Sequence, residues 1–331
     1  MNKNVYIVHG PFQLFNCCEA RHRFHENEQN ILIFIDRGDQ RNRDQTLRIL
    51  EKDPFDEFHH ISFQSISDKY LYPIRIKSIL KGITNADTLY VALYRNISSH
   101  IINTIQPNKV IIYDDGNRTL SATDRIFRKK QPEKFRTRAI LARLLGRRLD
   151  LQFTKTATYF SLYDLPQVPP ENYIKNDYQY YKKTVSALPV RDSVDFLGSK
   201  VIGYGINEKI FEALMQQIVS FYHERGRSLR YITHRSEPLD YLEKVAEKLG
   251  FELVNLPNII EVAYAQSDTF PCEIATLRTA AVSNLHTIFN LPVRVFEMPQ
   301  EQLATSAKKD LQGIYQNFRE QGFKLETLEL C

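Results

Sequence analysis

The chain of 331 residues lacks an apolar run long enough to cross a membrane, which takes roughly 20 consecutive apolar residues. Its opening residues, "MNKNVYIVHG", lead directly into a strand-like run, without an apolar signal region before it. We therefore expect a cytoplasmic protein that makes at most peripheral contact with the inner face of a membrane.

Residue patterns that commonly hold a metal or a phosphate are also missing. The four cysteines lack metal-binding spacing, and the adjacent Cys17 and Cys18 suggest reduced thiols in a core. No cluster of His, Cys and carboxylate residues points to a dedicated metal. The chain has neither a Gly-x-Gly-x-x-Gly sequence nor a Walker loop. We expect no metal and no cofactor.

The charge of the chain is uneven. Residues 125–148, "RIFRKKQPEKFRTRAILARLLGRR", contain ten Lys or Arg and one Glu, whereas the whole chain has a net charge of +5. Such a segment is commonly a solvated helix face, but it would also attract an anionic membrane by about 1 kcal/mol per basic residue. It is predicted to be partly helical, with Leu141, Leu144 and Leu145 on its apolar side. Because no nucleic-acid recognition motif accompanies the charge, we expect no nucleic-acid partner.

Apolar runs of strand length alternate with helix-like segments in both halves of the chain. The runs of the first half are 4–10, 30–36, 58–63, 87–93 and 109–116. Those of the second half are 199–205, 229–234, 251–257, 272–277 and 293–298. This alternation predicts parallel sheets covered on both faces, and therefore an α/β protein with two Rossmann-like domains.

A stretch rich in proline and polar residues interrupts this alternation, and we place the domain linker at 186–198. The predicted domains are 1–185 and 199–298, followed by a helical segment, 299–331, that packs back on the first domain. This outline resembles the GT-B type glycosyltransferase architecture. Periplasmic-type binding proteins share the outline, so the fold alone does not decide the function.

Two adjacent carboxylates, Asp114 and Asp115, follow a buried apolar run. One interpretation is a turn, because Asp-Gly is a common turn dipeptide and Gly116 permits a sharp bend. The other is a catalytic base, because ligands of open α/β sheets bind at the carboxyl ends of the strands.

Two features of the second half point to phosphate chemistry. His234 ends the strand-like run 229–234, and its imidazole titrates near neutrality, so it could stabilise a phosphate leaving group. The stretch "GYGIN", 203–207, lies at a strand-to-helix turn, where backbone amides such as that of Gly205 could meet a phosphate. Each feature is also compatible with a plain surface loop.

Together these motifs resemble those of bacterial sialyltransferases: glycosyltransferase family 52, which contains lipooligosaccharide sialyltransferases, the family 80 enzymes and the bacterial polysialyltransferases. Those families carry an acidic-acidic-Gly motif, a His-Pro motif, a glutamate and a Ser/Thr pair, in that order. Here Asp-Asp-Gly is followed by His234, Glu261 and Thr279 at similar spacing. The opening "GPFQLFN" also resembles their N-terminal segment, with matches at Pro11, Gln13 and Asn16, directly after Gly10.

The chain departs from this family pattern at two positions. Arg235 replaces the proline of His-Pro, which removes a constraint on the backbone after His234. Arg278 stands in place of the first hydroxyl residue, which leaves Thr279 and, one turn on, Ser283. Arg278 would add a guanidinium that matches phosphate oxygens.

The resemblance implies an inverting, metal-independent transfer of sialic acid from CMP-sialic acid to a hydroxyl of a lipooligosaccharide, O-antigen or capsule precursor. Asp115 would be the general base, and Asp114 would either help to bind the acceptor or raise the proton affinity of Asp115. His234, Thr279 and Ser283 would stabilise the leaving phosphate, and Glu261 would hold the ribose or cytosine of CMP. Gly10, Gln13 and Gly116 would line the acceptor side.

Three alternatives remain open at this stage. The donor of such an enzyme could be another CMP-nonulosonic acid, CMP-Kdo or a UDP-sugar. The chain could also be a non-catalytic binding protein with two lobes, in which Asp115 has no chemical role. A nucleic-acid-binding module has only the basic segment 125–148 in its favour.

Overall fold

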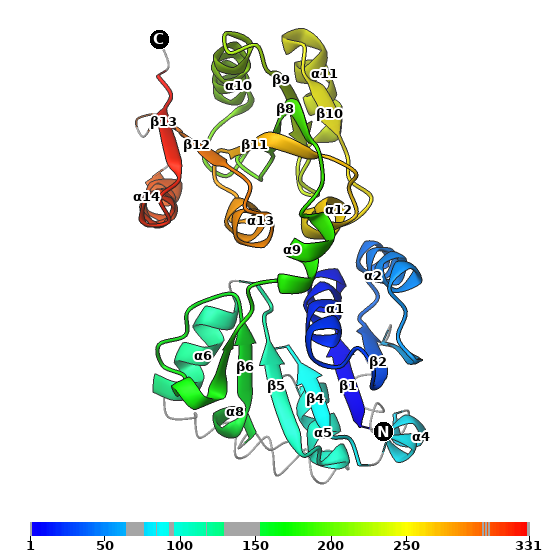
Figure 1. Ribbon diagram of the computed structural model, residues 1–331. Helices are drawn as coiled ribbons and strands as arrows, with labels where there is room; N and C mark the ends of the chain where they lie inside the picture. The colour runs from blue at the N-terminus through cyan, green and yellow to red at the C-terminus, as the bar shows by residue number, and fades with distance from the viewer. Residues whose placement is uncertain are drawn as a thin grey trace. The chain divides into compact units, whose positions relative to one another are not determined.

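A computed structural model describes residues 2–63, 76–83, 85–92, 96–116, 118–128, 153–299, 301, 303 and 305–329. The chain divides into two compact units, Met1–Tyr180 and Tyr181–Cys331. Each unit contains one parallel sheet with helices around it (Figure 1). This confirms the predicted fold class, an α/β protein with two parallel-sheet domains.

The sheet of the first unit has seven strands in the order β3-β2-β1-β4-β5-β6-β7. Its strands are β1 (Lys3–Val8), β2 (Gln29–Asp36), β3 (Glu57–Ser62), β4 (Thr88–Val91), β5 (Lys109–Tyr113), β6 (Thr158–Ser161) and β7 (Tyr173–Lys175). Its helices are α1 (Pro11–Phe24), α2 (Gln40–Lys52), α4 (Lys77–Gly82), α5 (Asn96–Ile105), α6 (Arg118–Arg128) and α8 (Phe153–Thr156). The central strands are almost wholly buried, because a parallel sheet is covered on both faces.

The sheet of the second unit has six strands in the order β10-β9-β8-β11-β12-β13. Its strands are β8 (Val190–Leu197), β9 (Ser228–Ile232), β10 (Glu252–Val254), β11 (Phe270–Thr276), β12 (Val293–Glu297) and β13 (Lys324–Thr327). Its helices are α10 (Glu208–His223), α11 (Leu239–Leu249), α12 (Ile260–Ala265), α13 (Ala281–Phe289) and α14 (Thr305–Glu320). All described strand pairs in both sheets are parallel.

The predicted first domain, 1–185, ends close to the division between the units, but the predicted linker is not a linker in the structure. The presumed linker 186–198 contains β8, which lies between β9 and β11, and the division between the units falls within α9 (Gln179–Val185). The predicted strand at 199–205 is instead a turn, because Gly203 adopts a φ of 75° and the N–H of Gly205 donates to the carbonyl of Val201. The second domain therefore begins before residue 199.

The end of the chain also differs from the prediction of one helical segment over 299–331. After α14, β13 pairs in parallel with β12 and extends the second sheet. Tyr315 of α14 accepts a hydrogen bond from the N–H of Met298 at the end of β12 (3.2 Å). The final segment thus belongs to the second unit, and its packing on the first domain stays a prediction.

Candidate functional site

Strand order locates the place in each sheet where a ligand is expected. In both sheets the order in which successive strands are added reverses beside the first strand. This happens between β1 and β4 in one sheet and between β8 and β11 in the other. In open α/β sheets, ligands bind at the carboxyl ends of strands near such a reversal. The sequence-predicted residues follow β1 and β5 in the first unit, and β8, β9 and β11 in the second. Glu261 is the exception, because it lies on α12.

Asp114 is a buried carboxylate with an internal role. Its side chain accepts hydrogen bonds from the hydroxyl of Ser161 (2.7 Å) and from the N–H of Leu162 (2.6 Å). Burial raises the pKa of Asp114 to about 6. The carboxylate thus joins the end of β5 to the end of β6. Its two predicted roles, in binding the acceptor or in raising the proton affinity of Asp115, stay predictions.

Asp115 lies nearer to solvent, with its side chain 16% exposed. Gln13 Nε2 donates to Asp115 Oδ1 at 2.6 Å, and the N–H of Asp115 donates to Thr119 Oγ1 at 2.9 Å. Arg118 Nη1 lies 4.0 Å from Oδ2. Gly116 has a φ of 63°, which confirms the sharp turn before α6. The turn and the base are therefore compatible interpretations of the same residues.

The N-terminal segment that the resemblance singled out meets this acidic pair. Gln13 accepts the N–H of His9 (2.8 Å) while it donates to Asp115. Asn16 donates to the backbone carbonyl of Asp114 (3.4 Å). A Cβ on Gly10 would lie 2.9 Å from the amide of Asn42, so glycine permits α2 to approach the start of α1. Residues about 100 positions apart in sequence thus meet at one edge of the sheet.

His234 follows β9 in a turn that Glu237 organises. The N–H of His234 donates to Glu237 Oε2 (2.6 Å), and Tyr231 Oη donates to Glu237 Oε1 (2.7 Å). Glu237 is buried, and burial raises its pKa to about 7. The sequence interpretation missed Glu237. The available signal was the spacing His-x-x-Glu, in which a glutamate reaches back to an N–H three residues earlier, as in a capping box. Arg235, between them, is exposed.

The turn between β11 and α13 is organised by another residue that sequence reasoning missed. Thr276 Oγ1 accepts the N–H groups of Arg278 and Thr279, both at 3.1 Å, and donates to the carbonyl of Leu197 (3.0 Å). Thr276 is fully buried. It therefore fixes Arg278 and Thr279 against the end of β8. Ser283 lies in the first turn of α13.

Arg278 and the glycine-bearing turn after β8 come together. The guanidinium carbon of Arg278 lies 4.5 Å from the ring centre of Tyr204, a cation–π distance. The N–H groups of Tyr204 and Gly205 both donate to the carbonyl of Val201. Because the amide of Gly205 is used within the turn, its predicted contact with a phosphate is not supported. The turn instead presents Tyr204 to Arg278.

Glu261 lies on α12 and its side chain faces α13. Asn284 Nδ2 donates to Glu261 Oε1 at 3.0 Å, and burial raises the pKa of Glu261. This contact places Glu261 beside the helix that carries Ser283. A direct contact with the ribose or cytosine stays a prediction.

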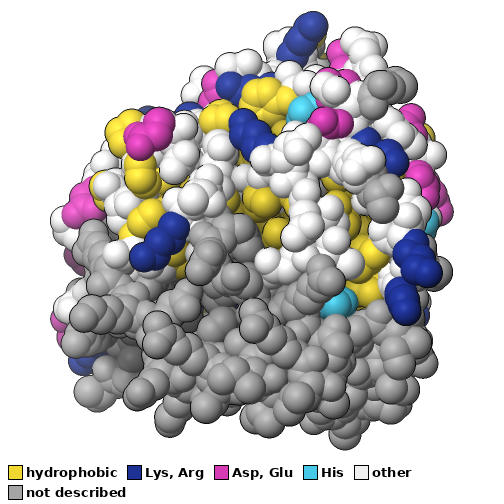
Figure 2. All heavy atoms as spheres, turned by 90° about the horizontal axis from the view of Figure 1, so that it is seen from below, with side chains coloured by type: hydrophobic (Ala, Val, Ile, Leu, Met, Phe, Trp, Pro, Cys, Tyr) yellow, Lys and Arg dark blue, Asp and Glu magenta, His cyan; other side chains and the backbone are white. Residues whose placement is uncertain are grey.

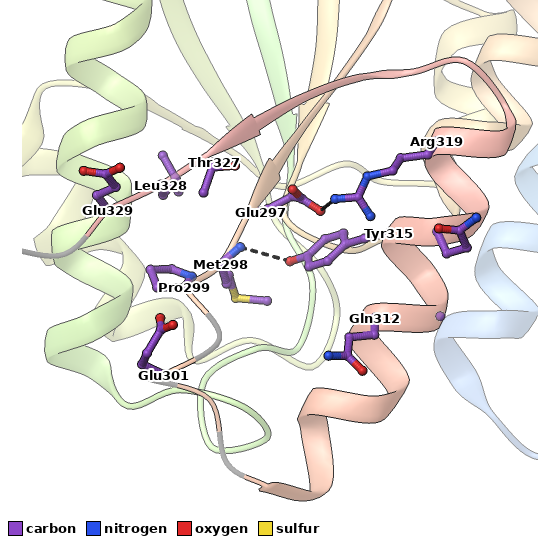
Figure 3. Close-up of a pocket in the computed structure, with 12 residues that line it drawn as sticks. Glu297, Met298, Pro299, Glu301, Gln312, Tyr315, Arg319, Thr327, Leu328 and Glu329 are labelled. Atoms are coloured by element: carbon purple, nitrogen blue, oxygen red, sulfur yellow. Dashed lines mark hydrogen bonds and ion pairs between the residues drawn. The ribbon is translucent and has the colours of Figure 1, made fainter.

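Two cavities of the second unit lie away from these residues. One, of about 940 Å³, lies between α14 and the ends of β12 and β13 (Figure 3). Glu297, Glu301 and Glu329 line it, and Arg319 is paired with Glu297. This acidic lining does not suit a phosphate. The other, of about 500 Å³, lies over β8 and β9, where Arg191 and Arg230 both pair with Asp195.

The predicted metal and membrane properties depend on different parts of the chain. Among the described residues, no group of three His, Cys, Asp or Glu side chains could hold a metal ion. No helix in the described part is long and apolar enough to cross a membrane. The basic segment 125–148 lies outside the described residues beyond 128. On the face in Figure 2, the described Lys and Arg side chains lie in separate small groups.

No family model and no curated protein matches the chain. Solved structures match its fold. The UDP-GlcNAc 2-epimerase of Methanocaldococcus jannaschii matches with a TM-score of 0.51 and 11% identity, over 89% of this chain and 83% of its own. Phytolacca americana UGT2, complexed with UDP-2fluoro-glucose and pterostilbene, matches with a TM-score of 0.51 and 12% identity, over 100% and 86%.

A 2,6-sialyltransferase of Photobacterium sp. JT-ISH-224, in a complex with CMP and lactose, matches with a TM-score of 0.47 and 11% identity, over 98% of this chain and 78% of its own. At that score the likeness carries no argument. The matches above 0.5 show the fold alone. The chain has the GT-B type of glycosyltransferase fold, as its sequence pattern predicts.

Proposed function

We propose that this protein is an inverting sialyltransferase, which moves sialic acid from CMP-sialic acid to a hydroxyl of a surface glycan precursor. The observation that carries the proposal is the hydrogen bond between Gln13 and Asp115. It joins two of the motifs on which the resemblance rests. It also fixes one carboxylate at the carboxyl end of a parallel strand, where GT-B and other open α/β sheets bind ligands.

In this proposal the first unit activates the acceptor. The carboxylate of Asp115 takes the proton of the acceptor hydroxyl as its oxygen attacks the anomeric carbon of the donor sugar. A glycosidic bond forms while the bond from the anomeric carbon to the CMP phosphate oxygen breaks, and CMP leaves with that electron pair. Gln13 orients the base, since its amide Nε2 donates to Asp115 Oδ1 and so fixes the plane of the carboxylate.

The second unit would bind the donor. His234, Arg278 and Thr279 follow β9 and β11, the strands on either side of β8. A donating imidazole and a guanidinium suit the single phosphate of CMP, whose charge grows as the bond breaks. Such fixed donors perform the electrostatic work for which other transferases use a metal ion, so we expect added EDTA to leave activity unchanged.

A panel of radiolabelled donors tests this function directly. The proposal predicts transfer from CMP-sialic acid, and no transfer from UDP-sugars. Transfer from CMP-Kdo or from another CMP-nonulosonic acid alone would keep the mechanism and replace the donor. Absence of transfer from every donor, together with ligand binding that Asp115→Asn leaves intact, would favour a non-catalytic binding protein.

The basic segment 125–148 supports one proposal about location. Ten basic residues beside the apolar Leu141, Leu144 and Leu145 suit peripheral contact with an anionic membrane. We expect the protein to sediment with anionic vesicles at low salt, and salt to weaken the binding. Equal sedimentation with neutral vesicles would contradict this, and so would none with either kind.

A further inference from the structure

We propose that Glu237 is a positioning residue, which ties together the turns after β8 and β9 and thereby fixes His234 at the donor end of the second sheet. The inference rests on the proposed function, because His234 has a catalytic task only if the second unit binds the donor. Glu237 itself is buried, so it acts through its neighbours and not on the substrate.

The contacts of Glu237 come from three places in the chain. Its Oε1 accepts from Tyr231 Oη at 2.7 Å, on β9. Its Oε2 accepts the N–H of His234 at 2.6 Å, in its own turn. The N–H of Ser199, after β8, also bonds to the carboxylate. One ionised carboxylate therefore satisfies donors of both turns, and such charge-assisted bonds are about twice as strong as neutral ones.

Gly198 shows how closely the two turns approach each other. A Cβ at this position would overlap the Glu237 carboxylate and would lie 2.7 Å from Tyr231 Cε1. The N–H of Gly198 donates to the carbonyl of Ile232 (2.9 Å), which holds the end of β8 against the end of β9. Only glycine leaves room for the carboxylate between the strand ends.

This arrangement also selects the tautomer of His234. The N–H of Ser236 donates to His234 Nδ1 at 3.3 Å. Because Nδ1 is the acceptor, the neutral ring carries its proton on Nε2. The imidazole can then donate from Nε2 to a phosphate oxygen. Glu237 fixes the backbone from which this ring projects.

The hydrogen bonds that join the two turns through Glu237 depend on its charge. Burial raises its pKa to about 7, so the carboxylate becomes protonated as the pH falls below neutrality. The titratable groups that face it are Tyr231 from β9 and His234 in its own turn, whereas Gly198 and Ser199 after β8 carry no charge. A protonated Glu237 is a weaker acceptor for the N–H of His234. We therefore expect the turn to loosen in mild acid.

The test follows the backbone amide of Ser199, which bonds to the Glu237 carboxylate and belongs to a residue without a titrating side chain, by NMR in the full chain, as a function of pH and without any donor. In the wild-type protein its amide resonance should titrate near pH 7. In Glu237→Gln that titration should disappear, and in the control Glu247→Gln, on the exposed face of α11, it should persist. Persistence of the titration in Glu237→Gln would overturn the inference.

A second variant covers the case in which Glu237→Gln does not fold. Tyr231→Phe removes one donor to the carboxylate and keeps the ring, so the midpoint of the Ser199 amide titration should move to higher pH. An unchanged midpoint would contradict the inference. In turnover, Glu237→Gln should lower kcat about 10-fold with a smaller change in KM, because a displaced imidazole weakens transition-state contacts. Unchanged kcat in a folded Glu237→Gln variant would also overturn it.

These measurements separate the inference from the proposed function. If the wild-type amide titrates but no CMP-sugar is turned over, the proposed function fails and only the structural tie stands. If transfer occurs while the amide titration is independent of Glu237, the proposed function stands and the inference fails.

Discussion

Each unit places a buried carboxylate next to a more accessible polar side chain, but with different local geometry. In the first, buried Asp114 lies next to the more accessible Asp115; in the second, buried Glu237 lies three residues after the more accessible His234. In both, the buried carboxylate bonds to neighbouring backbone or hydroxyl groups, and burial raises its pKa, to about 6 and about 7 respectively. In the proposed function, the outer side chain of each pair carries out the chemistry.

The difference lies in how the chain separates the inner group from the outer one. Side chains that follow one another along an extended strand point to opposite sides, so adjacent aspartates can divide into one buried and one accessible group. After β9 the chain turns, and a glutamate three residues later can reach back to the N–H of His234. The first arrangement can be recognised in the sequence as the Asp-Asp-Gly motif, whereas the second is marked only by the three-residue spacing of His234 and Glu237.

The largest loss of activity is expected when the outer carboxylate of the first unit, Asp115, is removed. Asp115→Asn keeps the shape and the bond from Gln13 but cannot accept the proton. We expect kcat to fall by about 10²–10⁴-fold, the usual contribution of a general base. Steady-state transfer assays check this, with Asp164→Asn as control, since that carboxylate is 89% exposed after β6. Activity within twofold of the wild-type protein in Asp115→Asn would remove the proposed base.

Removing the outer group of the second unit should have a smaller effect on turnover and an added effect on binding. His234→Ala takes away a donor to the leaving phosphate, so we expect about 10²-fold slower turnover together with weaker CMP binding. His223→Ala, at the exposed end of α10, is the control. A loss of turnover with CMP affinity unchanged would assign His234 to another task.

The inner carboxylate of the first unit, Asp114, should affect stability rather than turnover. Because the pKa of Asp114 is raised from 3.8 to about 6 in the folded chain, folding is favoured below about pH 4, and this contribution is lost as the pH rises through about 6. Thermal unfolding across this window should show the fall in the wild-type protein, and Asp114→Asn should flatten it. The same slope in both proteins would show that Asp114 does not titrate in this range.

The smallest effect is expected at the turn after Asp115. Gly116 has a φ of 63°, and the space that a Cβ would occupy is open, so Gly116→Ala meets only backbone strain. We expect a loss of about 1–2 kcal/mol in the free energy of unfolding. Denaturant titration measures it, with Gly313→Ala on α14 as control, since that position is also open. Equal stability of the two variants would remove the argument for strain at Gly116.

The predictable part of the structure was the part in which neighbouring residues repeat a pattern. Strands β1, β2 and β5 were found because each is a continuous apolar run. Strand β8 was misplaced because its first half, Val190–Ser193, is polar or exposed and follows a proline. Edge strands β7 and β13 were missed because they have only three or four residues and no fully buried side chain.

The candidate site also has a part that the sequence predicts and a part that it does not. The hydrogen bond between Gln13 and Asp115 agrees with the resemblance, which names both the N-terminal segment and the Asp-Asp-Gly motif. Glu237 and Thr276 act through single side chains that bond to backbone N–H groups, and a lone glutamate or threonine has no pattern that marks this role. Their functions depend on how the strand ends converge, which only the folded chain reveals.

The central claim is that the first unit serves the acceptor and the second serves the donor. Calorimetric titration of CMP into Asp115→Asn and His234→Ala, side by side with the wild-type protein, tests it most directly. The account predicts wild-type affinity for CMP in Asp115→Asn and clearly weaker affinity in His234→Ala. Equal loss of CMP affinity in both variants, or loss in Asp115→Asn alone, would contradict this division of tasks.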